Sequence, residues 1–175
     1  MPKKVKGATD KMTPAGKKLF AEIAKLVELE VESGFTSGKQ GYDQSNSSVN
    51  VEDYDNGTTI AEVAAYNEFG TKNSDGSQRI PERPFMRQSV EKNEDMIGKV
   101  GEELFKQFAQ GKLTADEAIR KMGALQVGLI QKEIRDGGFA ENDAATIKRK
   151  DSSKPLIDTA HMMQSIHYVV KPRKG

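Results

Sequence analysis

The sequence predicts an α+β fold: a small, mostly antiparallel sheet covered on one side by helices, with two long helices in the second half of the chain. Apolar residues recur at helical spacing in some segments and alternate with polar residues in others. These segments follow the order helix, strands, short helix, two long helices, strand, which is typical of the α+β class. Because the chain has no internal repeat and no second type of composition, the sequence favours one domain.

The length and composition of the chain limit what it can be. Its 175 residues are 35% hydrophobic and 30% charged, and a domain of this length buries about 70% of the surface that its unfolded chain exposes. The absence of cysteine excludes disulfides, thiolate metal sites and cysteine nucleophiles. No apolar run is long enough to span a membrane, and the N-terminal segment lacks the apolar core of a secretory signal. We therefore expect a soluble protein that is made in the cytoplasm and has no membrane partner.

The net charge of +1 hides an uneven distribution. Residues 1–18 hold six lysines against one aspartate, and residues 146–175 hold seven basic residues against two acidic ones. Between them, residues 28–68 hold nine acidic residues against Lys39 alone. Two interpretations stay open: a solvated surface with frayed ends, or basic arms that meet the acidic faces of neighbouring copies. A nucleic-acid footprint would need a basic stripe with interleaved aromatic residues, and the sequence has none.

The predicted organisation is one domain with short charged ends. It consists of a flexible basic N-terminal arm over residues 1–12, a single α+β domain over residues 13–171 and a basic tail over residues 172–175. Near the C-terminal end of the domain, residues 139–155 are irregular and basic. A short helix over residues 158–164 and a last strand over residues 165–170 are predicted to follow.

The domain is predicted to begin with a helix that leads into a strand. Thr13 as the N-cap and Pro14 at the first helical position open the helix. Its apolar face consists of Leu19, Phe20, Ile23 and Leu26. From Val27 onward the apolar residues alternate with glutamates, which predicts a strand with one solvated face that ends near Gly34 and Phe35.

Two polar segments are predicted to be loops. Residues 36–48 are rich in Gly, Ser and Asn and indicate a mobile loop, and residues 71–80 indicate another. Between them we predict a second short strand over residues 49–54, and Thr58 or Thr59 then caps a short helix. The buried side of that helix is expected to consist of Ile60, Val63, Ala64 and Tyr66.

An extended corner and two long helices follow. Pro81 and Pro84 bracket the corner, because each proline pushes its predecessor out of helical geometry. The first helix is predicted over residues 85–110, and a capping box formed by Thr114 and Glu117 opens the second. The inward residues of the first are Val90, Ile97, Val100, Leu104 and Phe108, and those of the second are Ala118, Met122, Leu125, Leu129 and Ile134.

The sequence contains no catalytic or cofactor-binding motif. Asp158 and His161 lie three residues apart on a predicted helix and could form half of a metal site, but such a site needs three or four ligands. The structural interpretation is that Asp158 caps the helix and His161 lies on its surface. A metal hydrolase centred on these two residues and His167 is the enzymatic alternative. We predict a protein that is not an enzyme, with no cofactor and no metal site.

Two segments combine aromatic and charged residues. They contain Tyr66, Asn67, Glu68, Phe69 and Gly70 and, one loop later, Arg83, Pro84, Phe85, Met86 and Arg87. Phe69, Phe85 and Met86 are predicted to be core residues. The alternative is a joint between subunits, because the fixed proline corner would aim Phe85 and Arg87 in definite directions.

These segments carry a resemblance to a family of bacteriophage proteins. Residues 61–71 and 80–87 are similar to motifs of the neck or tail-completion proteins, the tail components encoded beside head–tail connector genes in long-tailed phages. Residues 146–166 resemble the C-terminal motif of that family through Pro155, Leu156, Asp158 and Thr159, among others. The likeness extends over residues 27–170. The chain departs from the family at Ala160, where glycine is common, at Met163, where a basic residue is common, and in its longer insert over residues 36–48.

The resemblance implies a structural subunit at the junction between head and tail. Several copies would form a ring around the DNA channel through head-to-tail interfaces. Its partners would be copies of itself and the tail terminator, tail tube and head–tail connector proteins, with genomic DNA only passing through the channel. The protein would be assembled in the host cytoplasm and located in the virion, at the neck or the head-proximal end of the tail.

Two alternatives to this function remain. The nearest is a tail terminator, a small α+β ring subunit that stops growth of the tail tube. A DNA-binding protein is less favoured, because it would need a basic face and salt-sensitive affinity. A capsid-side connector is disfavoured because those proteins are mostly helical. Deleting residues 1–12 is expected to weaken assembly without unfolding the domain.

Overall fold

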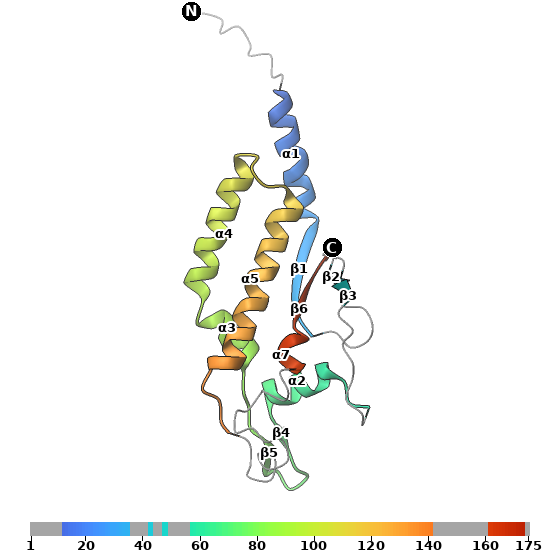
Figure 1. The fold of residues 1–175 in the computed structure, drawn as a ribbon, viewed down its shortest axis with the longest axis vertical. Coiled ribbons are helices and arrows are strands. Elements are labelled where there is room, and N and C mark those ends of the chain that lie inside the picture. Colours follow the sequence, from blue (N-terminus) through green and yellow to red (C-terminus); the bar gives the residue numbers. More distant parts are fainter. Residues whose placement is uncertain (1–11, 36–41, 44–46, 49–56, 142–160, 174–175) are drawn as a thin grey trace, which may run out of the picture.

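A computed structural model describes residues 12–35, 42–43, 47–48, 57–141 and 161–173 (Figure 1). The helices are α1 (Pro14–Val27), α2 (Ile60–Phe69), α3 (Phe85–Glu91), α4 (Glu94–Ala109), α5 (Ala115–Asp136) and α7 (His161–Gln164). The strands are β1 (Leu29–Gly34), β2 (Tyr42–Asp43), β3 (Ser47–Ser48), β4 (Thr71–Lys72), β5 (Gln78–Ile80) and β6 (His167–Pro172). These elements confirm the predicted α+β class.

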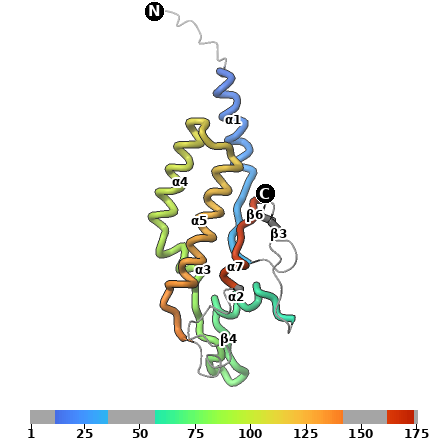
Figure 2. Tube along the Cα trace, in the orientation of Figure 1, coloured from blue at the N-terminus to red at the C-terminus, as the bar shows by residue number. Residues whose placement is uncertain are grey.

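All described strands pair antiparallel, but they form three two-stranded sheets instead of one small sheet. β1 pairs with β6 from Leu29↔Pro172 to Gly34↔His167, so strands from opposite ends of the chain lie side by side (Figure 1). Helix α5 packs on this pair and also contacts α1, α3 and α4. In the tube view, α4 and α5 run side by side, and α1 extends past the turn between them (Figure 2).

Two segments predicted as loops contain strands. Residues 36–48 include the β2–β3 pair, and residues 71–80 form the β4–β5 hairpin. The turn of the second hairpin is held locally: the Ser77 backbone N–H donates to the Asp75 carboxylate over 2.9 Å. Because the β4–β5 hairpin is held by turn hydrogen bonds and needs no apolar alternation, the sequence pattern did not reveal it. The predicted strand over residues 49–54 lies outside the described residues.

The prediction of a single long helix over residues 85–110 was wrong. The chain forms α3 and α4, with a break at Asn93, whose φ of −122° and ψ of 16° are not helical. The Asn93 side chain donates to the Ser89 carbonyl over 2.9 Å and thereby replaces a helical backbone bond. The change of direction leaves Val90, predicted to face inward, exposed, while Ser89 is buried.

The buried side of α2 also differs from the prediction. Ile60 and Ala64 are buried as expected, but Tyr66 is exposed and Glu68 is buried in its place. Residues four apart lie on one face of a helix, so Glu68 belongs to the same face as Ile60 and Ala64. The sequence pattern excluded it because it is charged. Its burial depends on partners in another helix, which are described below.

Three predicted helix starts are confirmed. The Thr13 hydroxyl accepts a hydrogen bond from the Gly16 N–H at the start of α1, over 3.1 Å. Thr59, not Thr58, is the N-cap of α2, where it forms a capping box with Glu62. The predicted capping box at Thr114 opens α5. Near the C-terminus, α7 and β6 lie where a short helix and a strand were predicted, with β6 shifted toward Pro172.

The core lies where α2, α3, α5 and α7 meet. Its buried cluster consists of Ile60, Ala64, Phe85, Ile130, Ile134, Met162 and Ile166. Farther along α5, the helix approaches the β1–β6 pair closely at Gly123: a Cβ added there would lie 2.5 Å from the Tyr168 ring. A glycine is therefore required for this helix–strand contact.

Candidate assembly site

Glu68, the penultimate residue of α2, caps another helix. Its side chain accepts hydrogen bonds from the Met86 N–H (2.9 Å) and the Arg87 N–H (3.2 Å) at the start of α3. The N-cap position of α3 is Pro84, which has no side-chain hydrogen bond to the helix, so Glu68 supplies the missing acceptor. Only 4% of the surface of Glu68 is exposed. The Arg87 guanidinium, 3.0 Å from the carboxylate, balances its charge.

Arg83 is a second buried charge in the same region, with 3% of its surface exposed. Its guanidinium donates to the backbone carbonyls of Ala140 (2.8 Å) and Glu141 (3.2 Å), which follow α5, and to the Asn67 side chain (2.7 Å). The Asn67 amide in turn donates to the Val63 carbonyl within α2. Burial lowers the pKa of the Arg83 guanidinium, which remains protonated at neutral pH. Arg83 thus ties the end of α5 to α2.

Gly70 connects α2 to the β4–β5 hairpin. Its φ of 67° lies in the left-handed region, where residues with a Cβ are strained. A Cβ at this position would also lie 2.9 Å from the Ile80 carbonyl oxygen and 3.0 Å from the Glu82 nitrogen. Only glycine allows the chain to turn out of α2 this close to the proline corner.

The aromatic residues of the two segments divide into buried and exposed. Phe85 is fully buried, as predicted, and packs edge-on against Phe35 with ring centroids 6.1 Å apart. Met86 packs against the core from its edge. Phe69, also predicted as core, is 68% exposed, because the charged neighbour Glu68 takes the inward position. The Arg87 guanidinium lies over the Phe69 ring, 5.6 Å from its centroid.

We call the set Asn67, Glu68, Gly70, Arg83, Phe85 and Arg87 the α2–α3 joint. It connects elements within one chain, so for these residues the structure favours the predicted internal role over the alternative of a joint between subunits. Tyr66 and Phe69 are the aromatic members of the two segments that reach the surface. The predicted motif residues near the C-terminus lie outside the described residues, so their roles stay predictions; they are Pro155, Leu156, Asp158 and Thr159.

The opposite end of the molecule, at α1, exposes apolar side chains (Figure 1). Among the residues whose side chains are described, nine large apolar residues are exposed, and four lie on α1 or directly before it. We call these four, Met12, Phe20, Ile23 and Val27, the α1 face. No residue of α1 is buried, although the sequence predicted an inward apolar side that included Phe20 and Ile23. The signal that could have revealed the face is its width, because the apolar residues of α1 cover more of the helix than a single neighbour can bury.

Polar contacts hold one side of α1 to the start of α5. The Glu22 carboxylate accepts a hydrogen bond from the Ala115 N–H over 2.7 Å. Lys25 forms an ion pair with Asp116, and its hydrogen bond to this carboxylate raises the pKa of the lysine. These contacts fix the orientation of α1, so its exposed face is held in place.

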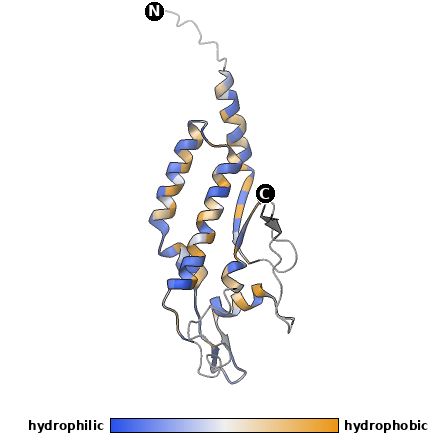
Figure 3. Ribbon diagram, viewed as in Figure 1, coloured by the Kyte–Doolittle hydropathy of each residue, from blue (hydrophilic) through white to orange (hydrophobic). Residues whose placement is uncertain are grey.

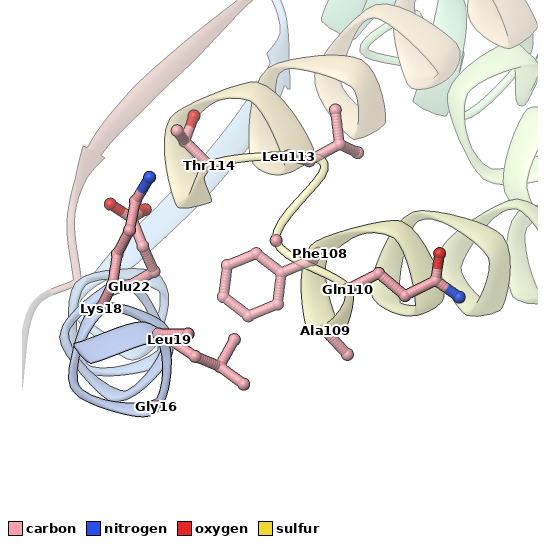
Figure 4. Close-up of a pocket in the computed structure, with 11 residues that line it drawn as sticks. Gly16, Lys18, Leu19, Glu22, Phe108, Ala109, Gln110, Leu113 and Thr114 are labelled. Carbon is pink, nitrogen blue, oxygen red and sulfur yellow. The ribbon is translucent and has the colours of Figure 1, made fainter. Parts of the chain in front are cut away.

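Two adjoining hollows lie between α1 and the α4–α5 hairpin. One, of ≈ 370 Å³, is open between Leu19 on α1 and the turn from Phe108 to Thr114. Figure 4 shows Leu19 and Phe108 facing each other across it. The other, of ≈ 220 Å³, is lined by apolar residues that include Leu26, Phe105 and Met122. Because Phe108 lines both, we treat them as one surface and call it the trough.

The candidate metal ligands are also placed by the structure where it describes them. Within the described ranges, no group of three or more His, Asp or Glu side chains lies close enough to share a metal ion. His167 is buried, with its Nδ1 3.0 Å from the Ser165 carbonyl oxygen. Asp158, the other half of the predicted metal pair with His161, lies outside the described residues. None of the helices in the described part of the chain combines the length and apolar character needed to cross a bilayer.

Comparison with known proteins gives no assignment. The chain matches none of the family models, none of the curated proteins and none of the solved structures that were searched. Any functional assignment therefore depends on the geometry of the two regions. In the α2–α3 joint the buried charges have hydrogen-bond partners within the chain, and on the α1 face apolar side chains are exposed.

Proposed function

We propose that this chain is a structural subunit of a tailed bacteriophage, a neck or tail-completion protein that assembles in several copies at the head–tail junction. One observation carries the proposal: α1 is an amphipathic helix with no buried residue, and its apolar face is uncovered. α1 contacts α5 along one side only, and contiguous exposed apolar surface marks interaction sites. A monomer with such a helix is completed by a partner.

The resemblance at residues 61–71 and 80–87 supports the same proposal from a different part of the chain. The segments that carry it meet in the α2–α3 joint, where Gly70, Arg83 and Glu68 each have a specific structural role. A rigid joint of this kind suits a subunit that must keep its shape under load in an assembly. The virion location and the partners named above, including the ring around the DNA channel, belong to the proposal.

Removing the subunit from the phage that encodes it tests the proposal. A stop codon in the gene should yield filled heads and tails of normal length that do not join, and wild-type protein added to the lysate should restore infectious particles. Mass spectrometry of purified particles should detect the chain in several copies. Tails of abnormal length would instead indicate a tail terminator. Normal particle yield, or absence of the chain from finished particles, would refute a structural role.

A gel-shift assay separates the DNA-binding alternative. A DNA-binding protein should retard duplex DNA at low salt and lose affinity steeply as salt increases. We expect no salt-dependent retardation at micromolar protein.

A further inference from the structure

The α1 face is too regular to be scattered surface residues. Its helical members, Phe20, Ile23 and Val27, recur at three- and four-residue spacing over the C-terminal half of α1, a distance of about 10 Å at 1.5 Å per residue. Figure 3 shows hydrophobic residues recurring along this helix, including the part that extends past the α4–α5 turn. Phe20 is 59% exposed and Phe105, on the facing edge of α4, is 63% exposed. An apolar ridge and an apolar trough therefore lie side by side on one surface.

The charges that flank the α1 face indicate what covers it. Three turns of an α-helix take about eleven residues, so Lys17 and Glu28 lie on the same flank of α1, near opposite ends. Both are exposed, and neither forms an ion pair with another described residue. In an antiparallel pair of identical helices, a flank meets the same flank of the partner with its ends exchanged. Lys17 of each copy would then face Glu28 of the other.

A parallel pair lacks this complementarity. In a parallel two-fold pair each flank meets the opposite flank of the partner at the same level, so Lys17 and Glu28 of the two copies do not meet. A generic apolar peptide would also leave both flanking charges unmatched. Only the antiparallel copy satisfies the ridge and both flanking charges together.

We propose that the α1 face is a homodimer surface, on which α1 of a second copy of this chain packs antiparallel. The pairing centre lies near Ile23, midway between Lys17 and Glu28. This pairing removes Phe20 of each copy from water.

The dimer concerns the free protein, and it rests, like the proposed function, on the exposure of the α1 face. Its interface is at the small end of stable protein interfaces, so we expect a dissociation constant of about micromolar. Sedimentation equilibrium of the full chain from about 1 to 200 µM should show a monomer–dimer equilibrium. A monomer throughout this range would overturn the proposal. It would leave a virion role untouched.

Matched phenylalanine variants test the face. Phe20→Glu should weaken dimerisation more than about thirtyfold, because a central aromatic residue is replaced by a charge. Phe69→Glu changes an equally exposed phenylalanine on α2 and should leave dimerisation unchanged. Thermal unfolding followed by circular dichroism should confirm that both variants fold. Equal association of the two variants would contradict the assignment of the face.

Charge exchange and cross-linking test the antiparallel direction. Lys17→Glu and Glu28→Lys should each weaken the dimer about fivefold, and the double variant should regain the wild-type affinity. The chain contains no cysteine, so single cysteines give a clean readout. Ile23→Cys, near the two-fold axis, should form a disulfide-linked dimer on oxidation. Phe20→Cys, offset from its counterpart by about 8 Å along the axis, should not. No regain of affinity, or the reverse cross-linking pattern, would rule out the antiparallel pair.

Discussion

Two regions at opposite ends of the molecule, the α2–α3 joint and the α1 face, differ in which side chains they bury (Figure 1). At the α2–α3 joint, the charged residues Glu68 and Arg83 are buried, and backbone and side-chain partners satisfy them. On the α1 face, aromatic and aliphatic residues remain in contact with water. Buried charges persist only where their partners are fixed, so the joint is complete within one chain. Exposed apolar residues gain stability from a partner, so the α1 end is incomplete without one.

We expect the largest difference in the free energy of unfolding between two phenylalanine-to-alanine variants, one in the joint and one on the α1 face. Phe85→Ala removes a fully buried ring and should lower the free energy of unfolding by about 3–5 kcal/mol. Phe20→Ala changes an exposed ring and should alter it by less than about 0.5 kcal/mol in the monomer. Urea unfolding at low protein concentration measures both. Similar losses for the two variants would break the comparison.

Glu68→Gln tests whether the joint depends on the buried carboxylate. The variant loses the charge that pairs with Arg87 and weakens the two hydrogen bonds to the start of α3. We expect a loss of about 2–3 kcal/mol in the free energy of unfolding. Glu82→Gln is the control, because Glu82 also pairs with Arg87 but is exposed, and it should cost under about 1 kcal/mol. Equal costs would indicate that burial of Glu68 contributes little.

Gly70 and Gly76 separate the cost of close packing at the joint from the cost of a left-handed backbone. Gly70→Ala should cost about 2 kcal/mol, because it combines left-handed strain with a contact to the Ile80 carbonyl. Gly76 has a φ of 85° but open space around it, so Gly76→Ala reports the strain alone, about 1 kcal/mol. Thermal unfolding of the two variants gives the difference. If Gly76→Ala were the more costly change, close packing at Gly70 would not be a constraint.

The smallest effect concerns the capping box at the start of α5. The backbone N–H of Thr114 donates to the Glu117 carboxylate and, with the Thr114 hydroxyl, lowers its pKa. A carboxyl group with a lowered folded-state pKa stabilises the fold above its unfolded pKa, and this contribution is lost as the pH falls through the folded value. The stability difference between wild type and Glu117→Gln should therefore shrink between about pH 5 and pH 3. Glu91→Gln serves as an exposed control, and a constant difference across this range would contradict the assignment.

The sequence predicted the parts of the fold that depend on local chemistry. Thr13, Thr59 and Thr114 were recognised because a cap needs only its own few residues. The break between α3 and α4 was missed because it depends on the Asn93 side chain, which takes the Ser89 carbonyl from the helix and leaves the apolar periodicity unchanged. The burial of Glu68 was missed because its partners lie in another helix, farther along the chain. The same cause hid the α1 face: periodicity predicts an apolar side, but only the packed structure says which part of it the chain itself covers.

Electron cryo-microscopy of the intact phage particle decides whether this chain is a subunit of the neck. We expect density for this fold, in several copies, between the head and the tail tube, with the joint intact within each copy and the α1 face covered by protein. Particles that lack the chain, or a chain in place with its α1 face open to solvent, would contradict it.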